Sequence, residues 1–426
     1  MSIAELLSSR LIVLPLRNRN FGLYSSGSAV SLTGMWMERI AIGWLTWQLT
    51  ESGFWLGVVA FADFFPVILI GPLAGAVADR WDRLRMVKTS QAVLLVQASV
   101  LWAFTAGGHI NVALIVALTA IHGIVVAFNQ PARLALVPSL VPHADLGSAV
   151  ALNSVIFNLA RFIGPIFAGL AIVWSGVALA FAANALSYVV FLAALARIRI
   201  APAEAEVPAS RRSFFADLGD GIRYTVTHPG IGALFVLLIA FGVGGRPLTE
   251  LLPGLADDVF QAGAGGLSLL ASAVGGGAIL GGIWLGHRAH DFDLMAVTLS
   301  TAVGSALSII AAIATDRLWV AVPAVVAFGF CISTAGIASQ TLVQLASARA
   351  MRGRVMGLYG LIFRGGPSIG ALGAGVASVQ LGLRWPILLG ALLVLAASLW
   401  AYLNRGRIAA ALESGSHAER SPDEKG

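Results

Sequence analysis

The sequence is poor in charged residues. Only 11% of its 426 residues are charged, whereas 58% are hydrophobic, and soluble domains carry about 25% charged residues. A water-soluble fold of this size has too few charges to cover so much apolar surface. The composition therefore excludes a soluble globular protein and indicates an integral membrane protein.

Cysteine and enzyme-like residue clusters are also scarce. The single cysteine, Cys331, excludes an intramolecular disulfide and a thiolate metal cluster. No group of His, Asp and Glu has metal-ligand spacing, no nucleophile accompanies an evident base, and no ATP-binding motif is visible. We therefore expect no enzyme activity, no cofactor and no bound metal. The first ten residues, MSIAELLSSR, lack the pattern of a cleaved signal peptide.

Long apolar stretches, by contrast, are abundant. A helix needs about 20 mainly apolar residues to cross the hydrocarbon core. Twelve stretches qualify, near residues 21–49, 54–78, 86–106, 110–130, 148–173, 177–196, 230–256, 265–286, 294–314, 318–346, 354–381 and 384–403. Backbone groups in lipid must be hydrogen-bonded internally, so the expected fold class is an all-α integral membrane protein with twelve transmembrane helices.

The basic residues predict the orientation. With the N-terminus in the cytoplasm, 21 of the 27 Lys and Arg residues fall in cytoplasmic segments, two in outer loops and four within spans. This asymmetry matches the positive-inside rule, so both termini are expected in the cytoplasm. The net charge of +6 then reflects topology and contact with anionic lipid, and we expect no nucleic-acid partner.

A polar segment divides the chain. Residues 197–229 begin with RIRIAPAEAEVPASRR, which is typical of a linker, and end in a pattern that fits either an amphipathic surface helix or an ordinary loop helix. We expect an N-terminal six-helix bundle in 1–196, a C-terminal six-helix bundle in 230–404 and a cytoplasmic tail in 405–426.

Two motif pairs indicate an internal repeat. GAVADRWDR, from Gly75, follows the second stretch, and GIWLGHRAH, from Gly282, follows the eighth. RFIGPIFAG, from Arg161, lies in the fifth stretch, and RGGPSIGALG, from Arg364, in the eleventh. Paired, pseudo-symmetric helical bundles are typical of secondary transporters.

These features resemble the major facilitator superfamily. Gly75, Asp79, Arg80 and Arg83 match the family's loop signature between the second and third helices, although Asp82 stands where the family usually has Gly. RNRNF, GPLAGAVADRWDR, NQPARLALVP and GPIFAG are similar to the bacterial exporter branch, which includes enterobactin-type siderophore exporters and macrolide efflux proteins. The resemblance implies that the loop signature holds a cytoplasmic gate shut through a latch with the eleventh helix.

Ionisable residues within the spans are candidate functional residues because they are costly in a bilayer. Glu38 and Asp63 are the candidates for proton coupling, with Glu38 favoured, and the alternatives are a structural salt bridge or an interfacial position. Arg161 and Arg364 are expected at similar depths and are candidates for the substrate cavity, unless each only orders its own bundle. Arg246 and Glu250 are four residues apart and favour a structural pair, whereas consecutive residues such as Glu38 and Arg39 need not pair.

Two further features of the spans are expected to be structural. Gly164, Pro165 and Gly169 loosely resemble the Gly-Pro signature of drug–proton antiporters and are expected to bend the fifth helix. His122, alone in the fourth stretch, is expected to be a core residue with its hydrogen bonding satisfied.

The predicted function is export of a small molecule, such as a siderophore, a drug or a related metabolite, by alternating access across a bacterial inner membrane. The expected energy source is a proton gradient, with the exported molecule exchanged for protons. The alternatives are an uptake permease or uniporter of the same fold, and a membrane receptor or scaffold without transport.

Overall fold

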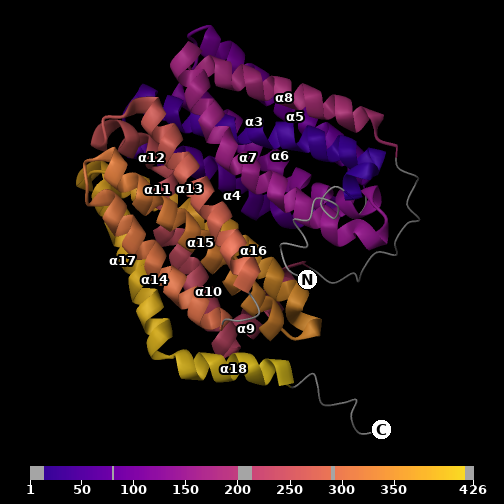
Figure 1. The fold of residues 1–426 in the computed structure, drawn as a ribbon, viewed down its shortest axis with the longest axis vertical. Helices are drawn as coiled ribbons and strands as arrows, with labels where there is room; N and C mark the ends of the chain where they lie inside the picture. Colours follow the sequence, from indigo (N-terminus) through magenta and orange to yellow (C-terminus); the bar gives the residue numbers. More distant parts are fainter. Residues whose placement is uncertain (1–13, 79–80, 200–213, 289–292, 418–426) are drawn as a thin grey trace. The chain divides into compact units, whose positions relative to one another are not determined.

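The computed structural model describes residues 14–78, 81–199, 214–288 and 293–417. Within these ranges the regular structure is helical and no strand occurs (Figure 1). Ten helices of this part of the chain are long and apolar enough to cross a membrane. The all-α, multi-pass membrane fold is therefore confirmed, while the count of twelve spans stays a prediction.

The segment before the linker forms six long helices. They are α3 (Arg19–Thr50), α4 (Gly53–Ala78), α5 (Arg83–Ala106), α6 (Val112–Leu136), α7 (Leu146–Ser175) and α8 (Val177–Arg197), with short 3-10 helices at Leu14–Arg17 (η1), Val137–Leu140 (η2) and His143–Asp145 (η3). Each long helix corresponds to one of the first six apolar stretches, and α6 begins two residues after the start of the fourth.

The segment after the linker begins with a surface helix and ends with one. Its helices are α9 (Phe214–Thr227), α10 (Pro229–Ala240), α13 (Gly263–Arg288), α14 (Leu294–Ile313), α15 (Leu318–Ala346), α16 (Arg349–Leu381), α17 (Arg384–Leu403) and α18 (Arg405–His417).

The seventh apolar stretch is broken rather than continuous. After α10 come a π-helical turn, η4 (Phe241–Gly245), two short helices, α11 (Pro247–Glu250) and α12 (Leu252–Gly254), and a second π-helical turn, η5 (Leu255–Val259). Pro247 and Pro253 have no backbone N–H to donate, which interrupts the helical hydrogen-bond ladder. The breaks place Glu250 at an irregular point of the backbone.

Helix caps and turns recur at corresponding places in the two halves. Asp82 caps α5 by accepting a hydrogen bond from the backbone N–H of Arg85, and Asp293 caps α14 by accepting from Met295. Gly176 joins α7 to α8 with φ = 84°, and Gly382 joins α16 to α17 with φ = 74°. Both turns need a left-handed backbone, which glycine adopts without strain.

By its contacts the chain divides into two compact units. The first contains residues 1–209 with 250–275, and the second contains 210–249 with 276–426. This grouping places residues 250–275 with the first unit, so the predicted boundaries of 1–196 and 230–404 remain proposals.

In the second unit, helices α9 and α18 lie against the membrane helices. Leu218 and Tyr224 of α9 pack on a core that includes Ile408 of α18 and residues of α10, α14, α15, α16 and α17. Arg354 of α16 pairs with Asp220 of α9 at 3.2 Å. Ile222 and Val226 are exposed on α9. The helix expected at the end of the linker is therefore present, with one face on the protein and apolar residues on another.

Candidate functional site

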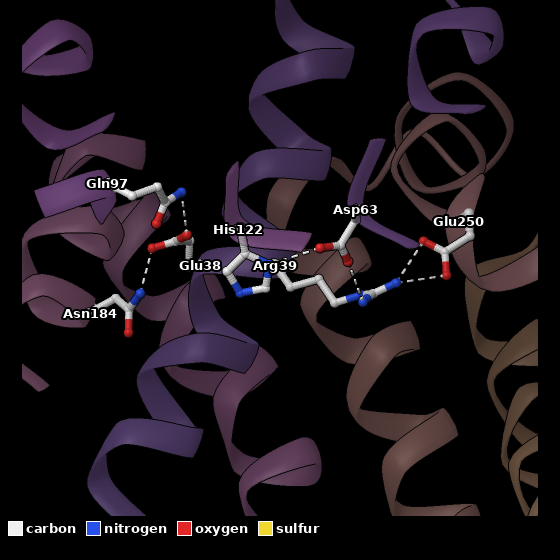
Figure 2. Close-up of polar contacts among 7 residues, drawn as sticks. All are labelled: Glu38, Arg39, Asp63, Gln97, His122, Asn184 and Glu250. Atoms are coloured by element: carbon white, nitrogen blue, oxygen red, sulfur yellow. Dashed lines mark hydrogen bonds and ion pairs between the residues drawn. The ribbon is translucent and has the colours of Figure 1, made fainter. Parts of the chain in front are cut away.

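The first unit contains a row of ionisable and amide side chains at the level of Glu38 and Arg39 of α3 (Figure 2). The two residues are consecutive, and neighbouring positions of a helix point about 100° apart. Their side chains accordingly contact different helices: Glu38 contacts α5 and α8, and Arg39 contacts α4 and α11. The row therefore has two parts with different chemistry.

Arg39 bridges two carboxylates. Its Nη1 lies 3.1 Å from Asp63 Oδ2, and its Nη2 lies 2.9 Å from Glu250 Oε1 and 3.1 Å from Oε2. The guanidinium also stacks over the Phe64 ring, 4.8 Å from its centroid. The side chains of Asp63 and Glu250 are 16% and 13% exposed, so this cation compensates charges that water reaches poorly. Glu250 thus has a pairing that sequence spacing alone did not predict.

Asp63 uses its second oxygen for His122. Nδ1 of His122 lies 2.8 Å from Asp63 Oδ1. Close packing of α4 and α6 makes this contact possible, because a Cβ placed on Gly123 would overlap the carbonyl oxygen of Asp63 and lie 3.1 Å from that of Ala62. Only glycine lets the two backbones approach this closely.

Glu38 is held by neutral amides. It is 3% exposed, and its Oε1 accepts a hydrogen bond of 3.1 Å from Gln97 Nε2 of α5. Its Oε2 accepts one from Asn184 Nδ2 of α8. The Ser187 hydroxyl, 3.0 Å from Asn184 Oδ1, orients that amide. Among the described residues, Glu38 therefore has hydrogen-bond donors as partners but no cation at ion-pair distance.

A small cavity of about 100 Å³ lies between the two parts. Glu38, Arg39, Asp63, His122 and Glu250 all line it, together with Thr119 and apolar residues of α3 and α4. The volume equals about three water molecules at about 30 Å³ each. It is too small for a drug-sized ligand, which needs about 300 Å³ or more. The cavity can hold water or an ion, and the described residues include no cluster suited to a metal.

A larger cavity of about 740 Å³ opens between α3, α7 and α8. Its walls are almost wholly apolar, including Phe167, Leu170 and Trp174, with Thr33 and Ser187 as polar exceptions. Trp174 is 85% exposed. No charged side chain lines this groove, so it offers nothing that would neutralise a charged group of a ligand.

The predicted gate residues are only partly described. Asp79 and Arg80 lie outside the described residues, and Gly75 lies near the end of α4. Arg83 donates a hydrogen bond of 3.3 Å from Nη1 to the carbonyl oxygen of Ala135, which joins the start of α5 to the end of α6. The latch with the eleventh helix therefore stays a proposal.

The two cavity arginines belong to different units. Arg161 of α7 lies in the first unit, with its guanidinium 5.6 Å from the centroid of the Trp36 ring. Arg364 of α16 lies in the second unit and is partly buried. Their shared contact with a substrate remains a proposal.

Gly164, Pro165 and Gly169 lie in a packed part of α7. A Cβ placed on Gly164 would lie 2.5 Å from the Cβ of Trp36 on α3, and a Cβ placed on Gly169 would lie 2.5 Å from the Oγ of Ser268 on α13. Both α3 and α13 therefore approach α7 closely. The Ser268 hydroxyl donates to the Pro165 carbonyl oxygen at 2.6 Å. The helix runs unbroken from Leu146 to Ser175, so the observed role of these residues is close packing, and bending remains a proposal.

Sequence reasoning missed the partners of the two acids. Gln97 and Asn184 are 59 and 146 residues from Glu38. The sequence feature that could have identified them is the presence of a polar amide residue within an apolar stretch. The Nδ1 of His122 has a hydrogen-bond partner, as expected of a core residue. That partner is Asp63, one of the two candidates for proton coupling.

Comparison with known proteins agrees with the fold. The family model described as transmembrane secretion effector, a major facilitator family, matches residues 12–424. The staphyloferrin A transporter of Staphylococcus aureus is 27% identical over 59% of this chain and 64% of its own length. Macrolide efflux protein A of Streptococcus pyogenes is 23% identical over 90% of this chain and 95% of its own. The enterobactin exporter EntS of Shigella boydii is 26% identical over 76% of each chain.

Solved structures show the same architecture. A bacterial homolog of the lysosomal transporter Spinster superposes with a TM-score of 0.72 at 14% identity, covering 93% of this chain and 98% of that one. A D-xylose–proton symporter gives a TM-score of 0.67 at 14% identity, covering 88% and 96%. At this identity the likeness shows the fold alone, but the family match extends over nearly the whole chain. The protein is a transporter of the major facilitator superfamily and belongs to its transmembrane secretion effector family.

Proposed function

We propose that this transporter exports a small molecule across a bacterial inner membrane in exchange for protons, with both termini in the cytoplasm. The observation that carries the proposal is the environment of Glu38. This carboxyl is buried on α3, which contains the first apolar stretch of the sequence, and it is hydrogen-bonded to two neutral amides. It can gain or lose a proton without breaking an ion pair, which is what a coupling residue must do as access alternates.

Asp63, the second coupling candidate, has different surroundings. Arg39 and His122 occupy its two oxygens, so protonation of Asp63 would break an ion pair. We assign the proton-carrying role to Glu38, and Asp63 acts through the groups that it contacts.

The relatives support a proposed substrate class. A siderophore transporter, a siderophore exporter and a macrolide efflux protein are similar to this chain over much of their length. We propose a siderophore, a drug or a related metabolite as the exported molecule. Arg161 and Arg364 are the proposed substrate contacts, and a rise in apparent KM in Arg161→Gln and Arg364→Gln would support them.

The gate proposal concerns the loop after α4. Asp79, Arg80 and Arg83 would hold the cytoplasmic side closed while the outer side is open. Asp79→Asn should then increase the labelling of cysteines introduced on the cytoplasmic side. Unchanged labelling together with normal transport would contradict the gate.

The experiment that tests the function uses the full chain in proteoliposomes. Enterobactin, staphyloferrin A and a macrolide are loaded in turn, and flux is measured with and without an imposed pH gradient, in both membrane orientations. Export predicts flux toward the acidic side that accelerates with the gradient, and Glu38→Gln should abolish the acceleration. Flux that ignores the gradient would contradict proton coupling, and no flux of any probe would contradict the substrate class.

A further inference from the structure

We propose that Glu38 exchanges a proton with His122 across the cavity of about 100 Å³ between them, and that Asp63 is the residue that positions His122 for this exchange. The inference rests on the proposed proton coupling and extends it to a second proton-carrying residue. It is carried by the direction in which the imidazole is held and by the polar lining of the cavity.

The contact with Asp63 fixes which imidazole nitrogen carries the proton. The Asp63 carboxylate pairs with Arg39 at 3.1 Å and has only acceptor oxygens. The imidazole nitrogen beside it, Nδ1 at 2.8 Å, must therefore donate. In neutral His122 the other nitrogen, Nε2, then carries a lone pair and no proton. Nε2 has no hydrogen-bond partner among the described residues, so it is available to accept a proton.

The cavity supplies a path between the two groups. Glu38 and His122 both line it, and in Figure 2 the imidazole is drawn between the carboxylates of Glu38 and Asp63. The Thr119 hydroxyl lines the same cavity and is buried without a hydrogen-bond partner in the described chain. A hydroxyl so placed can bind a water molecule that bridges the carboxyl and the imidazole.

The exchange balances without another reactant. The O–H bond of protonated Glu38 breaks, its proton passes through water to Nε2 of His122, and an N–H bond forms there. Glu38 becomes a carboxylate that still accepts from Gln97 and Asn184, and His122 becomes an imidazolium whose Nδ1–H remains on Asp63. The pair has zero net charge before and after the transfer, which avoids creating a lone charge in the membrane.

The Gln97 amide can form a hydrogen bond with Glu38 both before and after the proton transfer. Its Nε2 donates to Glu38, while its Oε1 is buried and has no hydrogen-bond partner in the described chain. Once Glu38 is protonated, rotation of this amide would bring Oε1 to the new O–H. The amide can therefore satisfy either protonation state.

Other charged groups also act on the pair. Among the described residues, the ionisable side chains near this pair are Arg39 on α3, Asp63 on α4 and Glu250 on α11, which line the cavity, and Tyr188 on α8, which interacts with Glu38. Arg161 on α7 contacts the cavity residue Trp36. Helix α5 contributes the neutral Gln97. His122→Asn, one of the variants used below, replaces only the imidazole and leaves these other side chains in place.

The test measures both titrations directly and needs no substrate. The full chain, labelled with ¹⁵N-histidine, is placed in lipid nanodiscs. The carboxyl band of Glu38 is followed by infrared spectroscopy and the ring of His122 by magnetic resonance, each assigned by its loss in Glu38→Gln or His122→Asn. Asparagine keeps a donor at the position of Nδ1 and so preserves the contact with Asp63.

Reciprocal coupling is the expected result. His122→Asn should raise the titration midpoint of Glu38 by about one pH unit, because the carboxylate loses a neighbouring cation. Glu38→Gln should lower the midpoint of His122 by a similar amount. Asp63→Asn should shift the midpoint of His122 downward as well. His109→Asn, the same substitution on an exposed residue of the first unit, should shift neither.

Independent titrations of Glu38 and His122 would overturn the inference, as would an unchanged His122 midpoint in Asp63→Asn. A loss of the folded, monodisperse protein in His122→Asn would also count against it, because it would show that the imidazole is required for packing. The flux experiment described under the proposed function distinguishes failure of that function from failure of this inference. Coupled titrations with proton-independent flux would contradict the proposed function alone, and proton-driven flux with independent titrations would contradict this inference alone.

Discussion

Arg39 and Glu250 are 211 residues apart in the sequence, and their side chains form an ion pair of 2.9 Å. The pair joins a helix that precedes the linker to the broken helix that follows it. Trp47 makes a second such link through a hydrogen bond of 3.0 Å to Asp257. Both links lie toward the predicted outer end of α3, so they would have to break if the two halves separated there during transport.

Removal of this arginine is expected to destabilise the protein. Arg39→Gln leaves Asp63 and Glu250 without their shared cation, and breaking a buried pair costs about 3 kcal/mol. We expect a clear fall in the thermal unfolding midpoint of the purified protein, measured by intrinsic fluorescence. Arg317→Gln, at an exposed position in a predicted outer loop, is the matched control and should have no measurable effect. Equal midpoints for the two variants would show that the ion pair does not stabilise the protein.

A methyl group at Gly123 is expected to push α4 and α6 apart. In Gly123→Ala the new Cβ would overlap the backbone carbonyl oxygen of Asp63, so the backbone must shift at a cost of about 2 kcal/mol. The control is Gly71→Ala on α4, where a Cβ would meet nothing within 4 Å. We expect Gly71→Ala to be neutral or slightly stabilising, and Gly123→Ala to lower the unfolding midpoint.

The same variant reports on the contact between His122 and Asp63. A shift of the backbone at Gly123 should move the imidazole away from the carboxylate, and the His122 resonance should change. An unchanged resonance with an unchanged midpoint would contradict the close approach of the two helices.

The sequence allowed the helices to be predicted because membrane insertion depends on local composition. Each apolar stretch satisfies its own backbone hydrogen bonds, so its length and hydropathy suffice to predict α8 or α14. The breaks after α10 were harder to foresee. Pro247 and Pro253 were visible in the stretch, but proline is tolerated within membrane helices such as α7.

The pairing of ionisable residues depends on which helices pack together. His122 is 59 residues from Asp63, and Asn184 is 146 residues from Glu38. Hydropathy indicates neither the neighbours of a helix nor its rotation. The candidates Glu38 and Asp63 were therefore found from their cost in a bilayer, whereas their different partners became visible only in the structure.

The hydrogen bond between Gln97 and Glu38 is expected to depend on the charge of Glu38. A hydrogen bond to a charged group contributes about 2 kcal/mol, roughly twice that of a neutral one. Gln97→Leu should therefore destabilise the parent protein more than it destabilises the Glu38→Gln variant. A double-mutant cycle of thermal unfolding measures this difference.

The control for this cycle lies on the same helix. Gln91 of α5 accepts a hydrogen bond from Ser31 and does not contact Glu38. Gln91→Leu should have the same cost in the parent protein and in the Glu38→Gln variant. Equal costs of Gln97→Leu in both backgrounds would show that Glu38 is uncharged under the conditions of the measurement.

His228 is expected to make the start of α10 sensitive to pH. It precedes Pro229, and its Nδ1 accepts a hydrogen bond of 3.3 Å from the backbone N–H of Ile231. Burial lowers the pKa of this imidazole below its usual value of 6.5. Since the unfolded state then binds the proton more readily, the stabilising contribution is complete above about pH 6.5 and decreases as the pH falls below it.

Protonation would also remove the acceptor and place a cation at a helix N-terminus, where the dipole disfavours it. Hydrogen exchange of the Ile231 amide should therefore accelerate relative to the rest of α10 as the pH falls from 7.5 to 5.5, after correction for intrinsic rates. His228→Asn keeps a capping side chain that does not titrate, and its exchange should be independent of pH after the same correction. A pH dependence that persists in His228→Asn would assign the effect to another group.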